Sequence, residues 1–336
     1  MKNDKILIDH GSGGKLSHDL VQQMILPVFD NSLLSRQDDG AVFQIGEDRF
    51  AFSTDTFVVT PLFFPGGNIG ELAVNGTVND LAMCGATPLF LSAGFIIEEG
   101  FSITDLEKVI SAMKKAADVA GVAIVTGDTK VVPIGAADQL FINTSGIGRV
   151  PDHVNISGRH AMPGDKIIVS GTIGDHAAAI LIKREGLPFE TPILSDTASL
   201  NHLVKKMLDA SDGIHVLRDP TRGGLGTTLN EIAIQSNTGI LISEDRIPVK
   251  KSVSGICGLL GFDPMYLANE GKLVAVVRKD DAEQILQVMK NDSLGKDACI
   301  IGEVVSDYPG KVMMTTHIGG TRFVDMLTGE QLPRIC

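Results

Sequence analysis

Along the first half of the chain, the hydrophobic pattern changes from strand-like alternation to helix-like spacing. Alternating apolar residues over 42–52 predict two strands, the second of which ends at residues 53–55. In residues 67–85, small and apolar residues recur in steps of three and four, which predicts a buried helix. Asn79 and Asp80 lie inside this helix, where a carboxylate is costly unless it is paired or bound to metal. They indicate either a helix cap or internal ion pair, or a ligand site.

A more clearly amphipathic helix follows the buried one. Ser102 begins it with a variant of the capping box, an apolar stripe runs along it, and Gly121 ends it. A strand over residues 122–125 comes next and leads directly into Asp128 and Lys130. We therefore expect a third acidic side chain, with a cation two residues further on, at the end of a strand.

The second half repeats the alternation of strands and helices. A strand over residues 140–150 closes the first half, and the polar segment 151–164, which contains Pro, Gly and His, predicts a connection between domains. Further strands are predicted over residues 166–170, 214–217, 272–277 and 299–305, and helices ending at residues 184, 210, 236 and 290. The pattern predicts two α/β domains, residues 1–152 and 153–318, followed by a flexible tail, residues 319–336.

Composition excludes several functional classes. A length of 336 residues fits two domains. The net charge of -12 and the lack of long basic runs disfavour a nucleic-acid partner. No signal peptide and no stretch of about 18 apolar residues is present, so we expect a cytoplasmic protein without a membrane span. The four cysteines are dispersed without a C-x-x-C motif, which fits a reduced compartment and predicts no zinc site.

Two glycine-rich segments are candidates for anion binding. Residues 9–15 lack the spacing of a Walker A loop, and a plain loop is as good an interpretation as a phosphate cradle. Residues 218–224 contain Arg222 and two glycines where a helix is predicted to begin, an arrangement that suits an anion. The alternative is structural, with Asp219 as the cap and Pro220 in the first turn of that helix.

Carboxylates from separate segments form the main candidate constellation. Oxygen ligands with few histidine or cysteine neighbours suit a hard cation such as Mg²⁺, which usually bridges to phosphates. Lys130 and Arg222 would balance phosphate charge, and the implied chemistry is phosphoryl transfer. The carboxylates of this constellation are Asp38, Asp39, Asp55, Asp80, Asp128 and Asp219.

Seven motifs give the sequence a specific resemblance. In chain order they are D-D-G-A-V, S-T-D, G-T-V-N-D-L-A-M-C-G-A, G-D-T-K-V, S-G-T-I-G-D-H, R-D-P-T-R-G-G-L and the terminal P-R-I-C. The inner motifs resemble the superfamily of aminoimidazole ribonucleotide synthetase, selenophosphate synthetase and thiamine monophosphate kinase. The terminal motif and the R-D-P-T-R-G-G block resemble one family within it, the carbamoyl dehydratases of hydrogenase maturation.

The resemblance implies a two-domain PurM-like α/β fold and a homodimer. The N-terminal domain would bind ATP and join its partner in a barrel-like interface, and the C-terminal domain would be an α/β sandwich carrying a mobile tail. The implied Mg²⁺ ligands are Asp39, Asp55, Asp80, Asp128 and Asp219. The residues implied around the nucleotide are Asp38, Asp39, Asp55, Asn79, Asp80 and Asp128, joined by Arg222.

The same resemblance assigns a reaction to the C-terminal Cys336. A partner, HypF, would carbamoylate the thiol, and ATP would drive dehydration of the S-carbamoyl group to a thiocyanate. The cyano group would pass to iron on a HypC–HypD complex for [NiFe]-hydrogenase. We expect Lys130 as the phosphate-side cation and Glu270 as the base. Glu270 is chosen on the resemblance, since its spacing also fits an ordinary loop residue before a strand. His10 and His176 rank below it.

Two other functions compete with this one. A sister enzyme of the superfamily would use the same carboxylates on a free small molecule and leave Cys336 idle. A non-enzymatic carrier would hold a metal or cyanide group on the thiol, with the carboxylates as surface charge. Loss of activity on removal of Cys336 would separate the first from the expected dehydratase. Loss of Mg-ATP binding on Asp80→Ala would exclude the second.

Overall fold

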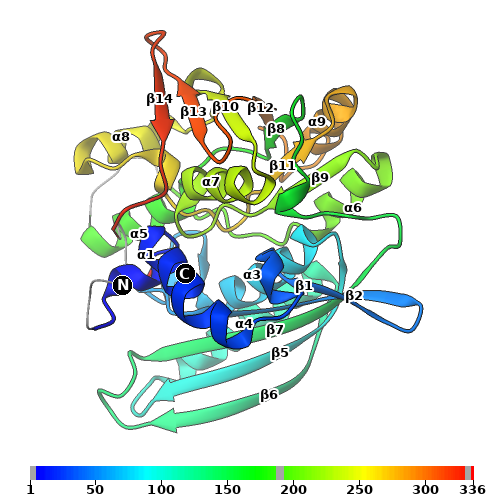
Figure 1. Cartoon of the computed structure of the whole chain (residues 1–336). Helices are drawn as coiled ribbons and strands as arrows, with labels where there is room; N and C mark the ends of the chain where they lie inside the picture. The colour runs from blue at the N-terminus through cyan, green and yellow to red at the C-terminus, as the bar shows by residue number, and fades with distance from the viewer. Residues whose placement is uncertain (1–4, 187–192, 330–333) are drawn as a thin grey trace.

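The chain folds into two α/β domains, each built on its own sheet (Figure 1). The structure is a computed structural model that describes residues 5–186, 193–329 and 334–336. The chain crosses from the first sheet to the second between Val150 and Lys166. The C-terminus lies near the middle of the molecule, beside the first domain.

The first domain has a five-stranded sheet in the order β1-β2-β7-β5-β6, in which only β5 and β6 are parallel neighbours. The hairpin between β1 and β2 turns through Gly46, whose φ of 62° suits a tight two-residue loop. The strands are β1 (Ala41–Ile45), β2 (Asp48–Phe57), β5 (Thr87–Glu98), β6 (Ala123–Val132) and β7 (Leu140–Val150), with a small hairpin of β3 (Phe63–Phe64) and β4 (Gly67–Asn68).

Helix α3 (Ile69–Met83) is the centre of the first domain. It packs on β2 and β7, lies under α4 (Ile103–Ala120) and also contacts the second domain. Its small residues permit this close packing, because a Cβ on Gly76 would stand 2.7 Å from the Phe57 ring. The N-terminal segment adds α1 (Lys15–Leu20) and α2 (Leu26–Phe29) beside the domain boundary.

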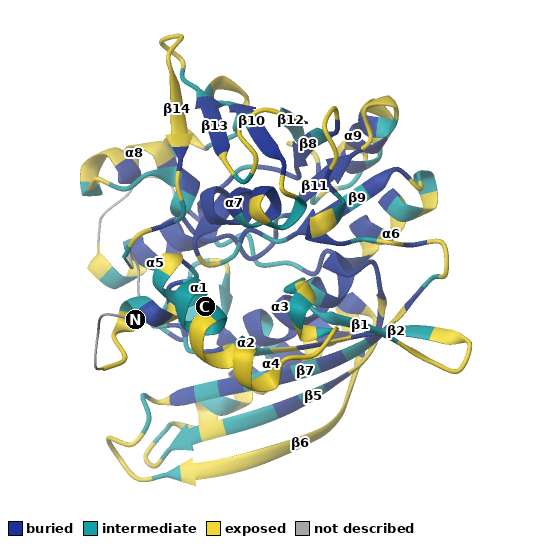
Figure 2. Cartoon of the chain, in the orientation of Figure 1, coloured by how far each residue is buried: buried dark blue, intermediate teal, exposed yellow. Residues whose placement is uncertain are grey.

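The second domain has a seven-stranded mixed sheet in the order β14-β13-β10-β12-β8-β11-β9. Its strands are β8 (Lys166–Val169), β9 (Ile214–Arg218), β10 (Gly239–Ser243), β11 (Val274–Val277), β12 (Cys299–Val305), β13 (Val312–Thr315) and β14 (Thr321–Val324). Its helices are α5 (Asp175–Glu185), α6 (Asn201–Ala210), α7 (Gly224–Ser236), α8 (Lys251–Leu260) and α9 (Ala282–Lys290). Burial is densest where α7 meets the sheet, whereas β6 of the first domain is exposed along most of its length (Figure 2).

Most predicted elements are present, and the departures concern their ends. The two helices of the first half are confirmed, and Gly121 ends α4 at a φ of 74°. Asp55 and Asp128 were expected beyond strand ends, but both lie inside strands, because β2 and β6 run on to Phe57 and Val132. That expectation was therefore wrong.

Two further corrections concern the second half. The helix expected from Asp219 begins only at Gly224, because the left-handed backbone of Gly223 and Gly224 delays its start. The strand ending at Val305 is followed by two more, and Thr321–Val324 pairs with β13. The mobile arm expected from residue 319 can therefore begin only after β14. Within the described residues, no helix combines the length and hydropathy needed to cross a membrane.

Candidate active site

The last residues of the chain are docked into the molecule. Ile335 and Cys336 are buried, at 4% and 7% exposure. The backbone N–H of Val58 donates to the carbonyl of Cys336 over 3.0 Å, and that of Thr60 donates to the carbonyl of Arg334 over 3.1 Å. The tail thus extends the hydrogen bonding of the segment that follows β2. Pro333, the first residue of the terminal P-R-I-C motif, lies outside the described residues.

Two side chains of α5 hold the tail from the other side. His176 Nε2 lies 2.7 Å from the carbonyl oxygen of Ile335, and its Nδ1 lies 2.8 Å from the Ser195 hydroxyl. Burial lowers the pKa of His176, so the ring is neutral, donates from Nε2 and accepts at Nδ1. Arg184 Nη2 donates to the carbonyl of Arg334 over 3.0 Å. His176, ranked low from sequence, is therefore a tail-binding residue.

Arg334 is engaged with the first domain. Its Nε donates to the carbonyl of Val58 over 3.0 Å, and its guanidinium forms an ion pair with Asp138. The same group lies 5.9 Å from the centroid of the Phe141 ring. In this arrangement Asp138 neutralises the charge of Arg334, which is therefore not available to bind phosphate.

The Cys336 thiol lies in a buried, charged environment. Burial raises its pKa well above the ordinary value for a thiol, Arg222 opposes that shift, and the charge and hydrogen bond of Glu270 add to it. The docked sulfur is therefore a protonated thiol. The glycine-rich segment 9–15 packs against Arg222, since a Cβ on Gly13 would stand 2.8 Å from the Arg222 carbonyl oxygen. The glycine-rich segment 9–15 thus permits close backbone contact.

Four half-buried carboxyl groups lie within electrostatic range of one another. Burial is the largest cause that raises the pKa values of Asp39, Asp55, Asp80 and Asp219, and mutual repulsion raises those of Asp80 and Asp219 further. Arg218 forms an ion pair with Asp39, and the Ser53 hydroxyl donates to Asp80 over 2.5 Å. The cluster carries more potential negative charge than its cations balance.

This carboxylate cluster fits a hard cation that also binds phosphate. Oxygen donors crowded enough to raise one another's pKa values gain most from a divalent ion. Among the described residues, no group of three or more carboxylate, histidine or cysteine side chains is close enough to enclose a metal alone. Water or phosphate oxygens would complete the coordination of such an ion.

A large cleft opens beside Asp39. Its volume is about 910 Å³, and its lining combines polar groups with aliphatic side chains, most of which come from the N-terminal segment. The polar lining includes Gly13, Asp38, Asp39, Ser53, Thr54 and Arg218, and the aliphatic lining includes Val21, Leu26, Leu33, Leu34 and Ile234. This combination suits a ligand with an apolar ring and an anionic end.

Two sequence-predicted residues lie away from this cluster. Asp128 and Lys130 sit on exposed β6, and their side chains form an ion pair of 2.8 Å. They line a hollow of about 260 Å³ on the sheet together with Phe141 and Asn143. Neither contributes to the environment of Cys336 in the same chain.

Asp38 and Asn79 bind the main chain. Asp38 accepts hydrogen bonds from the Ser157 hydroxyl and from the backbone N–H of Gly158, so it holds the connection between domains. The Asn79 amide nitrogen donates to the carbonyls of Ala198 and Glu270, over 3.1 and 3.2 Å. Both N–H donors of Asn79 are thus used to join the domains and are not free for a nucleotide. No signal in the sequence distinguished that role from ligand binding.

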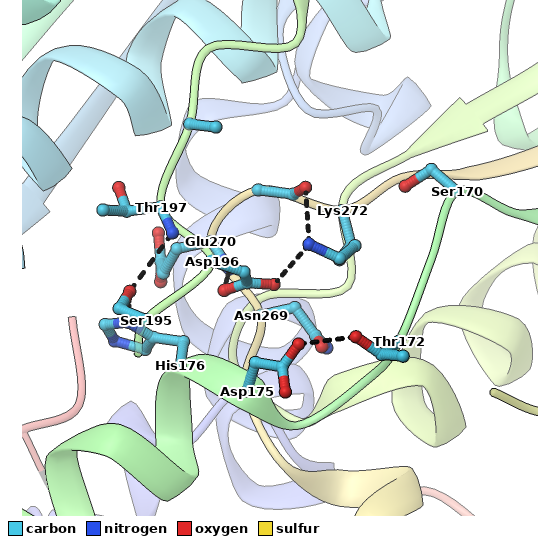
Figure 3. Close-up of polar contacts among 12 residues, drawn as sticks. Ser170, Thr172, Asp175, His176, Ser195, Asp196, Thr197, Asn269, Glu270 and Lys272 are labelled. Carbon is cyan, nitrogen blue, oxygen red and sulfur yellow. Dashed lines mark hydrogen bonds and ion pairs between the residues drawn. The ribbon is translucent and has the colours of Figure 1, made fainter. Parts of the chain in front are cut away.

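Glu270 is buried at 3% exposure, and burial together with Asp55, Asp219 and Asp196 raises its pKa well above the ordinary carboxyl value. Figure 3 shows it beside Asp196 and Lys272, which the sequence gave no reason to select. The backbone N–H of Glu270 donates to Asp196 over 3.1 Å, and Asp196 forms an ion pair of 3.2 Å with Lys272. His10, the other low-ranked histidine, is bonded to the backbone of Leu7.

Comparison with known families gives matches over both domains. Residues 37–150 match the model of the AIR synthase related protein N-terminal domain, and residues 162–314 match that of the C-terminal domain. A carbamoyl dehydratase HypE from Bradyrhizobium diazoefficiens is 52% identical over 100% of this chain and 97% of its own length.

Solved structures agree with that relationship. A chain of a HypE–HypF complex is 50% identical, covers 92% of this chain and 99% of its own, and superposes with a TM-score of 0.88. A hydrogenase maturation protein HypE in complex with ATP is 50% identical over 99% of this chain and 100% of its own, with a TM-score of 0.84.

Proposed function

We propose, on the premise that the chain belongs to the AIR synthase related family and within it to the HypE carbamoyl dehydratases, that it dehydrates an S-carbamoyl group on its own Cys336. One observation carries the proposal. The C-terminal thiol is buried inside its own fold, next to the Glu270 carboxyl and the Arg222 guanidinium. A tail that only ended the chain would gain nothing from entering a pocket lined by ionisable groups.

The chemistry requires a good leaving group and a base. ATP phosphorylates the carboxamide oxygen, the C–O bond then breaks with phosphate as the leaving group, and both N–H bonds break as the C≡N bond forms. Glu270 takes a proton from the nitrogen, since its raised pKa suits a carboxylate that must accept one. Arg222 stabilises the anionic oxygen beside the sulfur.

The carboxylate cluster would hold Mg²⁺ at the nucleotide phosphates. Asp39, Asp55, Asp80 and Asp219 supply oxygen ligands, and the ion when bound neutralises the charge of the transferred phosphoryl group. The cleft of about 910 Å³ beside Asp39 is wide enough for the adenosine part. The solved HypE complex with ATP supports a nucleotide in this family.

Formation of a homodimer would allow Lys130 to act as the phosphate-side cation. The face of the first sheet that carries Lys130 exposes large apolar side chains, an unusual arrangement for a free surface. They include Phe52, Phe90 and Ile96. Pairing two copies over this face would bury them and place the exposed Lys130–Asp128 pair, now outside the cluster, at an interface. Ile96→Asp should then yield monomers by sedimentation, whereas Ile318→Asp, on a distant exposed turn, should not.

The tail would serve two partners in turn. HypF carbamoylates the thiol, and the HypC–HypD complex accepts the cyano group for the iron of [NiFe]-hydrogenase. The solved HypE–HypF complex of a relative supports the first contact. Because the docked thiol is protonated and buried, modification requires that the tail leave its pocket first.

Mass spectrometry of the C-terminal peptide tests the proposal. After incubation with HypF, carbamoyl phosphate and ATP, we expect a carbamoyl adduct on Cys336 that converts to a species lighter by one water. Cys336→Ala should abolish both signals, and Cys299→Ala, at a half-buried thiol, should leave them unchanged. An unmodified thiol in a mixture with active HypF would contradict the dehydratase assignment. A free small-molecule product from the Cys336→Ala variant would favour a sister enzyme.

A further inference from the structure

We infer that the Glu231 carboxylate binds the ribose hydroxyls of the nucleotide and so selects ATP over its deoxy analogues. The inference rests on the proposed nucleotide site in the cleft beside Asp39. It gives a role to a side chain of α7 that the proposed dehydration of Cys336 does not otherwise use.

Glu231 lies on the part of the cleft wall that the second domain provides. It is half-buried on α7 and lines the cleft together with Ile234 and Gln235. These two residues follow it by three and four positions, so all three share one face of the helix. Much of the remaining lining comes from the N-terminal segment and from β2. The Glu231 side chain therefore faces the space in which the nucleotide would lie.

Electrostatic neighbours place Glu231 close to the phosphate end of this cleft. Burial raises the pKa of Glu231, Arg218 lowers it, and Asp39 raises it further. Of the four clustered carboxylates only Asp39 has this influence, so Glu231 lies at the edge of the cluster. Ile234, one helical turn further on, continues the aliphatic lining. Ribose joins the phosphates of a nucleotide to its base, and Glu231 lies between the corresponding parts of the cleft.

The Glu231 carboxylate is left without a hydrogen bond, in contrast to the other acidic groups of the cleft. Asp38, Asp39 and Glu231 are the three carboxylates in the lining. Asp38 accepts hydrogen bonds from the connection between the domains, and Asp39 forms an ion pair with Arg218. Within residues 5–186, 193–329 and 334–336, no hydrogen bond or ion pair ends on the Glu231 side chain.

Arg218 is already committed to other acceptors. Its Nη1 pairs with Asp39, and its Nη2 donates to the carbonyl of Gln37 over 2.7 Å and to the Gln235 side chain over 3.2 Å. Glu231 is therefore a partly desolvated acceptor that faces an open cleft. A ligand that brings hydroxyl donors to this position gains affinity, because hydrogen bonds to a charged acceptor are stronger than those between neutral groups.

A vicinal diol matches this acceptor. The 2′ and 3′ hydroxyls of ribose are neighbouring donors, and the two oxygens of one carboxylate can accept both of them. The metal is a poorer match, since three of the four clustered carboxylates do not influence Glu231. The adenine ring suits the aliphatic part of the lining, away from the charged end. We therefore assign Glu231 to the sugar.

Calorimetric titration with nucleotide analogues tests the assignment. Mg-ATP is compared with Mg-2′,3′-dideoxyATP, which lacks both hydroxyls, and with the Mg complex of purine riboside triphosphate, which lacks the amino group of adenine. Glu231→Ala removes the acceptor, and Glu231→Gln keeps the size of the side chain but removes its charge. Glu283→Ala, at an exposed glutamate of α9, is the matched control. Melting temperatures identify a variant that does not fold, and Glu231→Gln decides if Glu231→Ala is lost.

Wild type and Glu283→Ala should bind Mg-ATP at least about tenfold more tightly than the dideoxy analogue. In Glu231→Ala this ratio should fall to about one, because ATP binds more weakly while the dideoxy analogue binds as before, and Glu231→Gln should give an intermediate ratio. An equal loss of affinity for both nucleotides would overturn the assignment, since Glu231 would then only support Arg218. A wild-type ratio in both Glu231 variants, or a lost preference only against the purine riboside analogue, would also overturn it. If wild type binds no Mg-ATP at all, the proposed nucleotide site itself fails.

Discussion

Shortening the Ile335 side chain to alanine should weaken the docking of the tail without changing the reacting groups. Ile335 is buried at 4% exposure in a core cluster that includes residues of both domains, and Ile335→Ala removes about 2 kcal/mol of burial, at about 0.8 kcal/mol per carbon. Docking also gains about 5 kcal/mol from the hydrogen bonds that join the tail to Val58 (two), Thr60, His176 and Arg184, at about 1 kcal/mol each. Ordering of residues 334–336 costs about 1.5 kcal/mol each. The net preference for docking is then about 2–3 kcal/mol.

A preference this small makes the docked population sensitive to one side chain. Losing about 2 kcal/mol corresponds to about a thirtyfold change in the docking equilibrium. Protection of Cys336 against alkylation, measured by mass spectrometry of the C-terminal peptide, should fall by about that factor in Ile335→Ala. Ile318→Ala removes the same carbons from a side chain that is 83% exposed, and should not alter protection. Equal protection of Cys336 in wild type and Ile335→Ala would refute this account of docking.

Three further predictions follow from the charged groups. Asp80→Asn should abolish Mg-ATP binding in titration calorimetry yet raise the melting temperature of the unliganded protein. The reason is that the folded-state pKa of Asp80 is raised, so its ionisation at neutral pH opposes folding; a lower melting temperature would contradict this. Protection of Cys336 should be constant below the ordinary thiol pKa of about 8.5 and fall above it, because the docked pKa is raised and docking favours the protonated form. Asp138→Asn breaks a half-exposed ion pair with Arg334, so protection should fall by less than about fivefold, and a larger loss would mean that this pair dominates docking.

Sequence reasoning located the carboxylates better than it described their surroundings. Helical spacing placed Asp80 in a buried helix, and burial is what raises its pKa. Asp128 belongs to the same set of motifs, yet it lies on an exposed strand. Neither the periodicity nor the motif indicates which face of a sheet is exposed to solvent. His176 and Asp196 were missed as tail and base partners because their roles depend on contacts with Ile335 and Glu270, which are 159 and 74 residues away in the chain. Contacts of that range come from the fold, and local patterns do not encode them.

Most of the hydrogen bonds that hold the tail end on its main chain. The bonds from Val58, Thr60, His176 and Arg184 end on carbonyl oxygens of the last three residues. None of these groups donates to the sulfur. In the proposed cycle, these bonds would hold the free, carbamoylated and cyanated tails in the same register. Such binding would not distinguish substrate from product, so the direction of the proposed cycle would come from ATP and from the proteins that compete for the exposed tail.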